Sequence, residues 1–160
     1  MEIRFAQSRD IPGLLRLLEQ VGEVHHRLRP DIFRSGAVKY DASALEALLQ
    51  DPDRPVFVAE VEGDVGGYCF CVRKEIPDSH LLVGRQELYI DDLCVEETLR
   101  RRGIAKALSL RAVAYAKSIG CQTLTLNVWQ GNTGAQHFYE QMGLRPRNIL
   151  MELPLEESEC

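Results

Sequence analysis

The chain has 160 residues, of which 45% are hydrophobic and 27% charged, and its 24 acidic residues outweigh 19 lysines and arginines to leave a formal net charge of −5. We expect one domain over residues 1–160, because this length matches the usual size of a single compact unit. The charge disfavours a protein that binds nucleic acid through overall positive charge, and no apolar run approaches the roughly 20 residues that span a bilayer.

Hydrophobic periodicity predicts a mixture of helices and strands along the chain. Apolar residues recur at the i, i+3, i+4, i+7 spacing of a helix in some segments and alternate as in a strand in others. In chain order we expect a short strand over residues 1–7, a helix from Ser8 to about 21, a helix from about 41 to 50, strands over 56–61, 65–72 and 87–95, a helix over 103–119, a strand over 121–129, a helix over 133–142 and a last strand over 150–153. This order indicates an α/β (α+β) domain with helices layered around one sheet, followed by an acidic tail, about 156–160, that is too polar to pack.

The cysteines and histidines give no pattern typical of a disulfide framework or a metal site. The five cysteines stand at positions 69, 71, 94, 121 and 160, an odd number without the paired Cys-x-x-Cys spacing of a zinc site. His25 and His26 are adjacent, so they lack the spacing with which two histidines on one helix share a metal ion. We expect no metal. Free thiols, and an N-terminus without the apolar segment of a secretory signal, favour a reducing, cytoplasmic compartment.

Three consecutive arginines, Arg100, Arg101 and Arg102, stand where a strand gives way to a helix. A helix N-terminus already carries about half a positive unit charge, so arginines there are unfavourable for stability alone. Gly103 lets a ligand approach the backbone, Ala105 adds no bulk, and the free N–H groups of a first helical turn can hydrogen-bond phosphate oxygens. The position favours an anion-binding turn over the alternative, a solvated basic surface.

The sequence around this turn resembles the GNAT superfamily of N-acetyltransferases. Arg100-x-x-Gly103-x-Ala105 is similar to the acyl-CoA-binding motif of that family, (Gln/Arg)-x-x-Gly-x-(Gly/Ala). A second recurrent signature of the family is matched further along by Asn132-x-x-Ala135-x-x-Phe138-Tyr139-Glu140-x-x-Gly143-Leu144. The resemblance covers the element order from residue 1 to about 153. It implies a mixed, mostly antiparallel central sheet that splays between its fourth and fifth strands, with helices on both faces.

The resemblance also implies which residues hold acetyl-CoA, the co-substrate of the family. The implied pyrophosphate cradle comprises Arg100, Arg101, Arg102, Gly103, Ile104 and Ala105. The backbones of Leu93, Cys94 and Val95 are expected to pair with the pantetheine arm as an added strand would. Asn132 suits a helix N-cap on its own, and the resemblance adds a contact with CoA.

Acetyl transfer to an amine needs a base for the ammonium and benefits from an acid for the departing thiolate. Tyr139 matches the family's tyrosine near the CoA sulfur and is the expected acid, with a core aromatic as the alternative. Asp91, Asp92 and Glu87 are the candidate bases. In a regular strand Asp91 and Asp92 point to opposite faces and Glu87 is in phase with Asp91. A structural role for this set, as a salt bridge or a strand bulge, is left equally open.

The function expected from these observations is transfer of an acetyl group from acetyl-CoA to a primary amine of a small molecule or peptide, by direct attack on the thioester. The alternative from another class is a non-catalytic CoA-binding regulatory protein on the same fold. A nucleic-acid-binding module built on the arginines is disfavoured, because the chain is acidic. The sequence does not identify the acceptor, although its charge favours a cationic one. The resemblance further suggests a homodimer through Leu150–Leu155.

Overall fold

The computed structural model describes residues 1–155, and the acidic tail expected over about 156–160 lies outside the described residues. The chain forms two compact units, residues 1–127 and the residues from 128 on. Nearly all of the regular structure lies in the first unit, which also holds the strand that leads into the arginine turn.

One sheet of five strands forms the centre of the first unit, and the order of the strands in space follows the chain. The first four are antiparallel to their neighbours and the last pair is parallel, which confirms the expected mixed, mostly antiparallel sheet. The strands are β1 (Glu2–Phe5), β2 (Val56–Val61), β3 (Asp64–Ile76), β4 (Arg85–Val95) and β5 (Thr123–Leu126).

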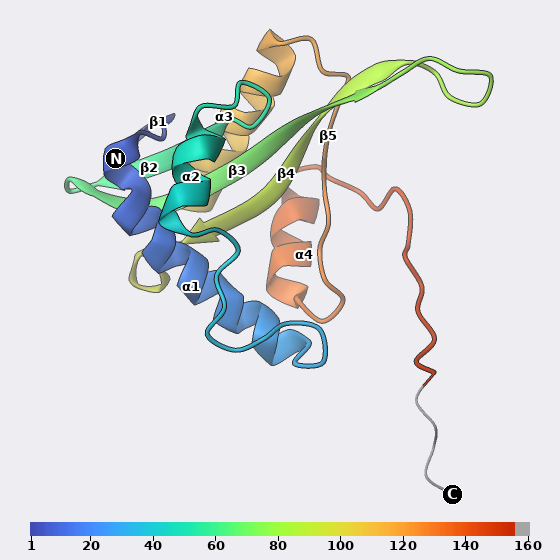
Figure 1. Ribbon diagram of the computed structural model, residues 1–160. Helices are drawn as coiled ribbons and strands as arrows, with labels where there is room; N and C mark the ends of the chain where they lie inside the picture. Colours follow the sequence, from blue (N-terminus) through green and yellow to red (C-terminus); the bar gives the residue numbers. More distant parts are fainter. Residues whose placement is uncertain (156–160) are drawn as a thin grey trace, which may run out of the picture. The chain divides into compact units, whose positions relative to one another are not determined.

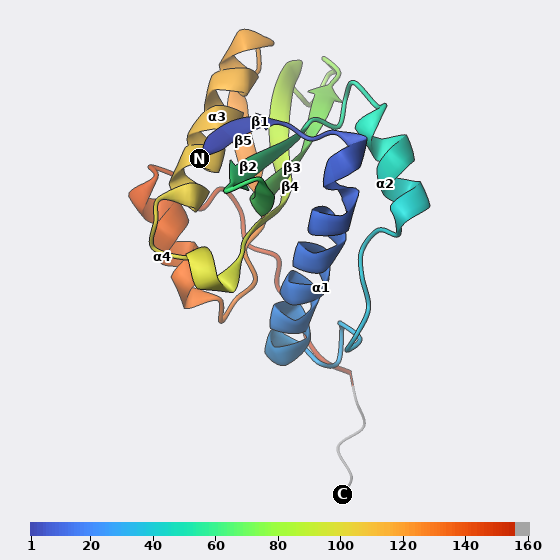
Figure 2. The ribbon, with the colours of Figure 1, turned by 90° about the vertical axis from the view of Figure 1, so that its left-hand side faces the viewer.

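Helices cover both faces of this sheet, as Figures 1 and 2 show. α1 (Ile11–Leu28) and α2 (Ala42–Leu49) pack on one face, and α3 (Ile104–Ser118) packs on the other. Side chains alternate along β3, so Tyr68 joins the core under α1 while its neighbour Cys69 joins the core under α3. The two faces of the sheet are therefore distinct surfaces, and a side chain's position on a strand decides which helices surround it.

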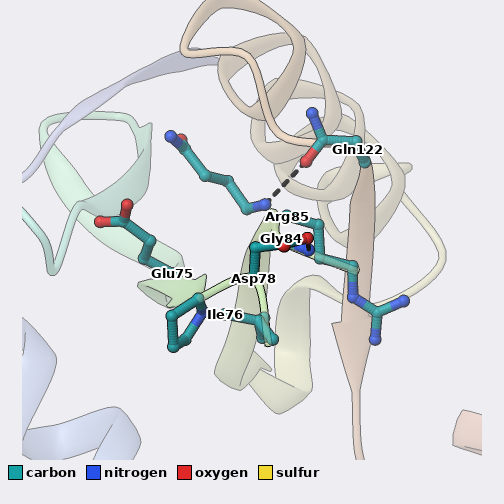
Figure 3. A pocket seen from close by; sticks show the side chains of 8 residues that line it. Glu75, Ile76, Asp78, Gly84, Arg85 and Gln122 are labelled. Carbon is teal, nitrogen blue, oxygen red and sulfur yellow. Dashed lines mark hydrogen bonds between the residues drawn. The ribbon is translucent and has the colours of Figure 1, made fainter. Parts of the chain in front are cut away.

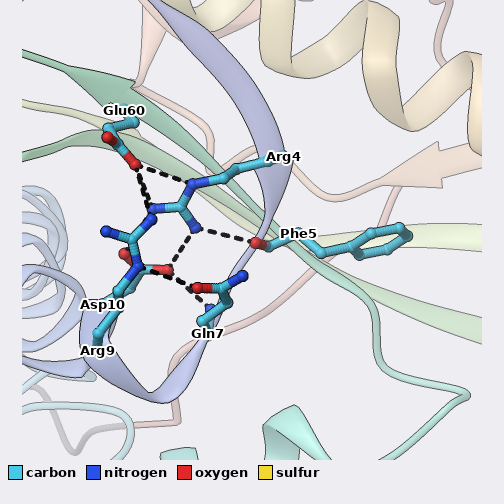
Figure 4. A network of polar contacts seen from close by, with 6 residues as sticks. All are labelled: Arg4, Phe5, Gln7, Arg9, Asp10 and Glu60. Carbon is cyan, nitrogen blue, oxygen red and sulfur yellow. Dashed lines mark hydrogen bonds and ion pairs between the residues drawn. The ribbon is translucent and has the colours of Figure 1, made fainter. Parts of the chain in front are cut away.

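Strand β1 is fixed to the rest of the unit through Arg4, whose guanidinium lies at the centre of the network in Figure 4. It donates to both carboxylate oxygens of Asp10 (2.8 and 2.9 Å) and to Glu60 of β2 (2.9 Å). Burial alone works to raise the pKa of Asp10, but the hydrogen bonds from Arg4 and from the Gln7 N–H hold that pKa below its ordinary value. The network joins the edge strand to the start of α1.

Helix α1 differs from its prediction at both ends. A short 3-10 turn over Ser8–Asp10 precedes it, and the Ser8 hydroxyl donates to Glu46 (2.8 Å) instead of capping the helix. The helix then continues to Leu28, well past the expected end near residue 21. Polar residues on an exposed helical face do not end a helix, whereas Pro30 disfavours the helical conformation of the residue before it.

The second unit contains one helix, α4 (Thr133–Gln141), among its described residues. Asn132 Oδ1 accepts a hydrogen bond from the Ala135 N–H (3.2 Å), which confirms the predicted N-cap. The strand predicted over residues 150–153 is wrong, because residues 144–155 form neither helix nor strand and the Leu150 side chain is 98% exposed. Alternating apolar residues form a strand only where another strand edge supplies hydrogen bonds.

Candidate functional site

The central sheet opens between β4 and β5. The two strands pair only over Glu87–Ile90, whereas β3 accompanies β4 as far as Val95. β5 ends at Leu126, short of the predicted end near residue 129. Within the first unit, the last five residues of β4 therefore have no strand partner on the side away from β3. A free edge of this kind can pair with an extended ligand, and the opening between these strands confirms the expected splay.

Asp91 is the extra residue of a β-bulge in β4. The residues on either side of it, Ile90 and Asp92, pair with consecutive residues of β3, so Asp91 has no partner across the ladder. A bulge shifts the alternation of faces. Asp92 contacts Tyr68 and Asp91 contacts Tyr40, both on the face covered by α1 and α2. The expectation that the two carboxylates point to opposite faces is wrong, because it assumed a regular strand.

The Asp92 carboxylate lies in an environment that makes it unusually basic. The Tyr68 hydroxyl donates to Asp92 Oδ2 (2.9 Å). Burial raises the pKa of Asp92 from the ordinary 3.8 to about 6, although the Tyr68 hydrogen bond and the charge of Lys39 act to lower it. Burial also raises the pKa of Tyr68 well above its usual range, so this hydroxyl stays protonated. A carboxylate that titrates near 6 is ionised at neutral pH and still basic enough to accept a proton.

Asp91, in contrast, is held by partners on other elements. Lys39 Nζ forms an ion pair with Asp91 Oδ2 (2.8 Å), and the Tyr40 hydroxyl donates to the same oxygen (3.1 Å). Arg54 Nη2 donates in turn to the Tyr40 oxygen (2.9 Å). Burial works to lower the pKa of Lys39, but the hydrogen bond and charge of Asp91 outweigh it and raise that pKa. Asp91 therefore forms a structural ion pair with Lys39.

Two other predicted site residues on β4 are engaged elsewhere. Glu87 is buried and accepts from Arg85 Nη2 (2.9 Å), and it lies five residues, or roughly 16 Å of strand, before Asp92. Cys94 is buried under α1, and burial, with the Asp92 charge next, raises its pKa to about 12. A thiol with such a pKa is almost entirely protonated at neutral pH, which disfavours a covalent acyl-cysteine route. Of the three candidate bases, Asp92 has the most suitable surroundings.

The turn between β4 and α3 has the geometry of an anion site. Arg101 (φ 64°) and Gly103 (φ 78°) both take the left-handed conformation, and no side chain caps the α3 N-terminus. A Cβ built on Gly103 meets no atom within 4 Å, so the space above it is open. The side chains of Arg100, Arg101 and Arg102 are exposed, and none forms an ion pair within residues 1–155. Open backbone N–H groups beside free guanidinium groups fit a pyrophosphate.

Two residues of α1 hold the end of β4 in place just before this turn. This role was not predicted from the sequence. Gln20 Nε2 donates to the Val95 carbonyl (3.0 Å), and its Oε1 accepts from the Glu97 N–H (3.3 Å). One turn earlier, Arg16 forms an ion pair with Glu96 and donates to the carbonyl of Val65 (2.9 Å). The signal was present in the sequence as two polar residues at i, i+4 beside the apolar stripe of the helix. The Val95 carbonyl, one of the three expected to pair with the pantetheine arm, is therefore already hydrogen-bonded to Gln20.

Asn132 and Tyr139 belong to the second unit. The Tyr139 ring lies edge-on to Phe138, with 5.0 Å between ring centroids, and its carbonyl accepts from the Leu144 N–H (3.0 Å). The helix therefore presents the residues of the second signature in regular geometry. Their contacts with CoA and with the departing thiolate stay predictions.

Two pockets of the first unit are lined by neither Asp92 nor the arginine turn. One, of about 310 Å³, lies at the far end of the β3–β4 hairpin between Glu75, Asp78 and Gln122 (Figure 3), and the other, of about 320 Å³, lies beside Phe5 and Tyr115. Among residues 1–155 there is no group of three or more histidine, cysteine or carboxylate side chains placed to hold a metal ion. Within the same range, no helix combines the length and apolar character that a membrane crossing requires.

Comparison with known proteins identifies the relatives of this chain. The sequence pattern of the "Acetyltransferase (GNAT) family" matches residues 20–144. A solved structure of a variant of the BH1408 protein from Bacillus halodurans is 34% identical, with a TM-score of 0.94 over 98% of this chain and 100% of that chain. An aminoglycoside N-acetyltransferase, AAC(6')-Iy, solved in complex with CoA, shares the fold (TM-score 0.72, 15% identity, 97% of this chain and 99% of that one).

Among curated sequences, L-ornithine N5-acetyltransferase NATA1 of Arabidopsis thaliana is 32% identical over 95 residues, which are 59% of this chain and 41% of that enzyme. The chain spans less than half the length of the curated relatives that it matches.

Proposed function

The chain belongs to the acetyltransferase (GNAT) family, and from that premise we propose that it transfers an acetyl group from acetyl-CoA to a primary amine by direct attack on the thioester. The observation that carries the proposal is the corner between β4 and α3. A free strand edge is followed there, after a short 3-10 turn over Glu97–Leu99, by a turn with two left-handed residues and three exposed arginines that form no ion pair within residues 1–155. The strand edge suits the amide-bearing pantetheine arm of CoA, and the arginine turn suits its pyrophosphate.

On the donor side, the chain's own groups bind and orient. The N–H groups of Ile104 and Ala105 and the guanidinium groups of Arg100, Arg101 and Arg102 would hold the pyrophosphate, with Gly103 leaving room for it. In an antiparallel ladder only alternate residues turn their N–H and C=O away from the neighbouring strand, so of Leu93 and Cys94 it is Leu93 whose carbonyl faces away from β3 and would bond a pantetheine amide. When bound, acetyl-CoA supplies an acetyl group activated as a thioester.

On the acceptor side, Asp92 is proposed as the general base. An alkylammonium has a pKa of about 10 and must lose a proton before its nitrogen can attack. Asp92 takes that proton, directly or through one water, and the Tyr68 hydroxyl keeps the carboxylate oriented. A carbon–nitrogen bond then forms as the carbon–sulfur bond breaks, and Tyr139 is proposed to protonate the departing thiolate. The nitrogen loses its second proton as the amide forms, and that proton restores the Tyr139 hydroxyl.

We propose a cationic amine of a small molecule or basic peptide as the acceptor. The net charge of −5 attracts cations over distances of about a Debye length, and the Asp92 carboxylate, which accepts from the Tyr68 hydroxyl, adds a negative charge at the bulge of β4. The named substrates of the relatives, ornithine and aminoglycosides, are also cationic amines.

The test combines binding with turnover. Acetyl-CoA at saturating concentration should raise the melting temperature, because a ligand that binds only the folded chain stabilises it. Release of free CoA thiol should then depend on the amine, across a panel of spermidine, ornithine, lysine, basic peptides and aminoglycosides. Stabilisation without thiol release for any amine would favour the non-catalytic CoA-binding alternative, and no stabilisation would refute both.

A further inference from the structure

The segment between α1 and α2, residues 29–41, is fastened to the end of α1. The His25 ring stacks on Phe33 with 4.9 Å between centroids, and His26 Nδ1 lies 2.7 Å from the Phe33 carbonyl oxygen. Glu23 Oε1 accepts from the N–H of Gly36 (2.8 Å). These contacts hold the middle of the segment in place, so its last residues reach β4 from a fixed direction.

At its other end the segment meets the bulge of β4. Lys39 reaches Asp91 with an ion pair of 2.8 Å, and Tyr40 reaches the same carboxylate with its hydroxyl. The Tyr40 ring packs at 5.7 Å from the ring of Phe70, which fixes the direction of the hydroxyl. Because of the bulge, Asp91 and Asp92 share one face, so the cation that meets the first carboxylate also lies in the field of the second.

We propose that Lys39 is a positioning residue for the acceptor side of the site: it neutralises Asp91, so that Asp92 beside it remains available as the ionised base. The inference rests on the proposed function, because it assigns Lys39 a role through Asp92. It differs from a purely structural tether, since a tether fixes the segment without changing how Asp92 binds its proton.

Several titratable groups surround Asp92, and Lys39 is the cation among those that act on it most strongly. The groups on the same face as Asp92, facing it or its partners, are Asp91 and Cys94 on β4, Tyr68 on β3, Lys39 and Tyr40 from the segment, His25 on α1 and Arg54 before β2. Cys69 lies on the opposite face of the sheet, and its hydrogen bond with Cys71 and burial raise its pKa well above the ordinary value. Near neutral pH the thiols and phenols are uncharged. Loss of the Lys39 charge therefore leaves two carboxylates side by side with no cation paired to either, which disfavours the ionised form of Asp92.

The experiment compares Lys39→Met, which removes the charge, with Lys39→Arg, which keeps it. The titration of the Asp92 carboxyl carbon is followed by NMR in the parent and in both variants, so this reading does not depend on turnover. We expect the midpoint, about 6 in the parent, to rise by roughly one unit in Lys39→Met and to stay near the parent value in Lys39→Arg. In turnover, Lys39→Met should lower kcat/KM for the acceptor below pH 7 and recover at higher pH.

Two results would overturn the inference: an unchanged Asp92 midpoint in Lys39→Met, or an equal shift in Lys39→Arg. Affinity for acetyl-CoA serves as the control, because Lys39 does not contact the β4–α3 turn, and it should be the same in all three proteins. If the parent binds no acetyl-CoA or acetylates no amine, the proposed function fails even where the NMR midpoints move as expected. The two failures are therefore separable.

Discussion

At the scale of single residues, the two adjacent carboxylates on β4 are expected to behave oppositely. Asp91 pairs with the Lys39 ammonium and accepts from the Tyr40 hydroxyl. Asp92 accepts from the Tyr68 hydroxyl, and burial raises its pKa. We therefore expect substitution of Asp91 to change mainly stability and substitution of Asp92 to change mainly acetyl transfer.

Asp92→Asn should stabilise the protein at neutral pH while abolishing acetyl transfer. The folded chain binds the Asp92 proton more tightly than the unfolded chain, since the pKa rises from 3.8 to about 6 on folding. Stability therefore falls as the pH rises from about 4 to about 6 and stays lower above that window. A shift of this size corresponds to about 3 kcal/mol, and Asn, which cannot ionise, removes that cost. Thermal unfolding at pH 4 and pH 7 measures it.

The matched variant Asp91→Asn should do the reverse at pH 7, losing about 1 kcal/mol with its partly exposed ion pair. A gain for Asp92→Asn that is equal at pH 4 and pH 7 would contradict the assignment, because a protonated Asp and Asn differ little in charge.

Gly103→Ala should weaken acetyl-CoA binding far more than it weakens folding. The left-handed conformation of Gly103 (φ 78°) makes any Cβ cost about 1 kcal/mol, and the new methyl group stands where the pyrophosphate is proposed to approach. Gly120, at the other end of α3, has the same conformation (φ 81°) and equally open surroundings. Gly120→Ala should therefore lower the melting temperature by a similar amount without changing acetyl-CoA affinity, as titration calorimetry would show. Equal affinities in the two variants would remove Gly103 from the cradle.

At the scale of secondary-structure elements, α1 supports the donor site from the opposite face of the sheet. Gln20→Leu removes the bonds to the Val95 carbonyl and the Glu97 N–H, which close the corner that leads into the arginine turn. Each such bond contributes about 1 kcal/mol, so we expect roughly three- to tenfold weaker acetyl-CoA binding. Its neighbour Glu19 is exposed and supplies the control Glu19→Gln. Equal acetyl-CoA affinity in both variants would show that the corner holds its shape without Gln20.

Most elements were predictable from the sequence because their signals are local. The bounds of β2 matched the apolar run over residues 56–61, and α2 and α4 began after Asp41 and Asn132, whose side chains cap them. The sequence leaves the bulge at Asp91 open as one of several roles for the carboxylates, because a bulge depends on the register against β3, a contact between distant residues. The contacts of Gln20 and Lys39 with β4 are unpredictable for the same reason, since each joins residues more than fifty positions apart.

At the scale of the whole molecule, the residues after α4 carry an unusual amount of exposed apolar surface. The side chains of Ile149, Leu150, Met151, Leu153 and Leu155 are 78–98% exposed. Burying one large aliphatic side chain is worth about 2 kcal/mol, so a run of this kind favours association. This gives a physical reason for the homodimer suggested by the family resemblance, which stays a prediction.

We expect sedimentation equilibrium at micromolar concentration to show a dimer, and the double substitution Leu150→Glu with Leu153→Glu to shift it to monomer. Leu81, at the tip of the β3–β4 hairpin, is 89% exposed and supplies the matched control Leu81→Glu. The control should leave the dimer intact, because it makes the same Leu→Glu change, once instead of twice, at a similarly exposed leucine elsewhere. Dissociation by the control alone would place the contact at the hairpin tip, and a parent chain that is monomeric at all concentrations would refute the dimer.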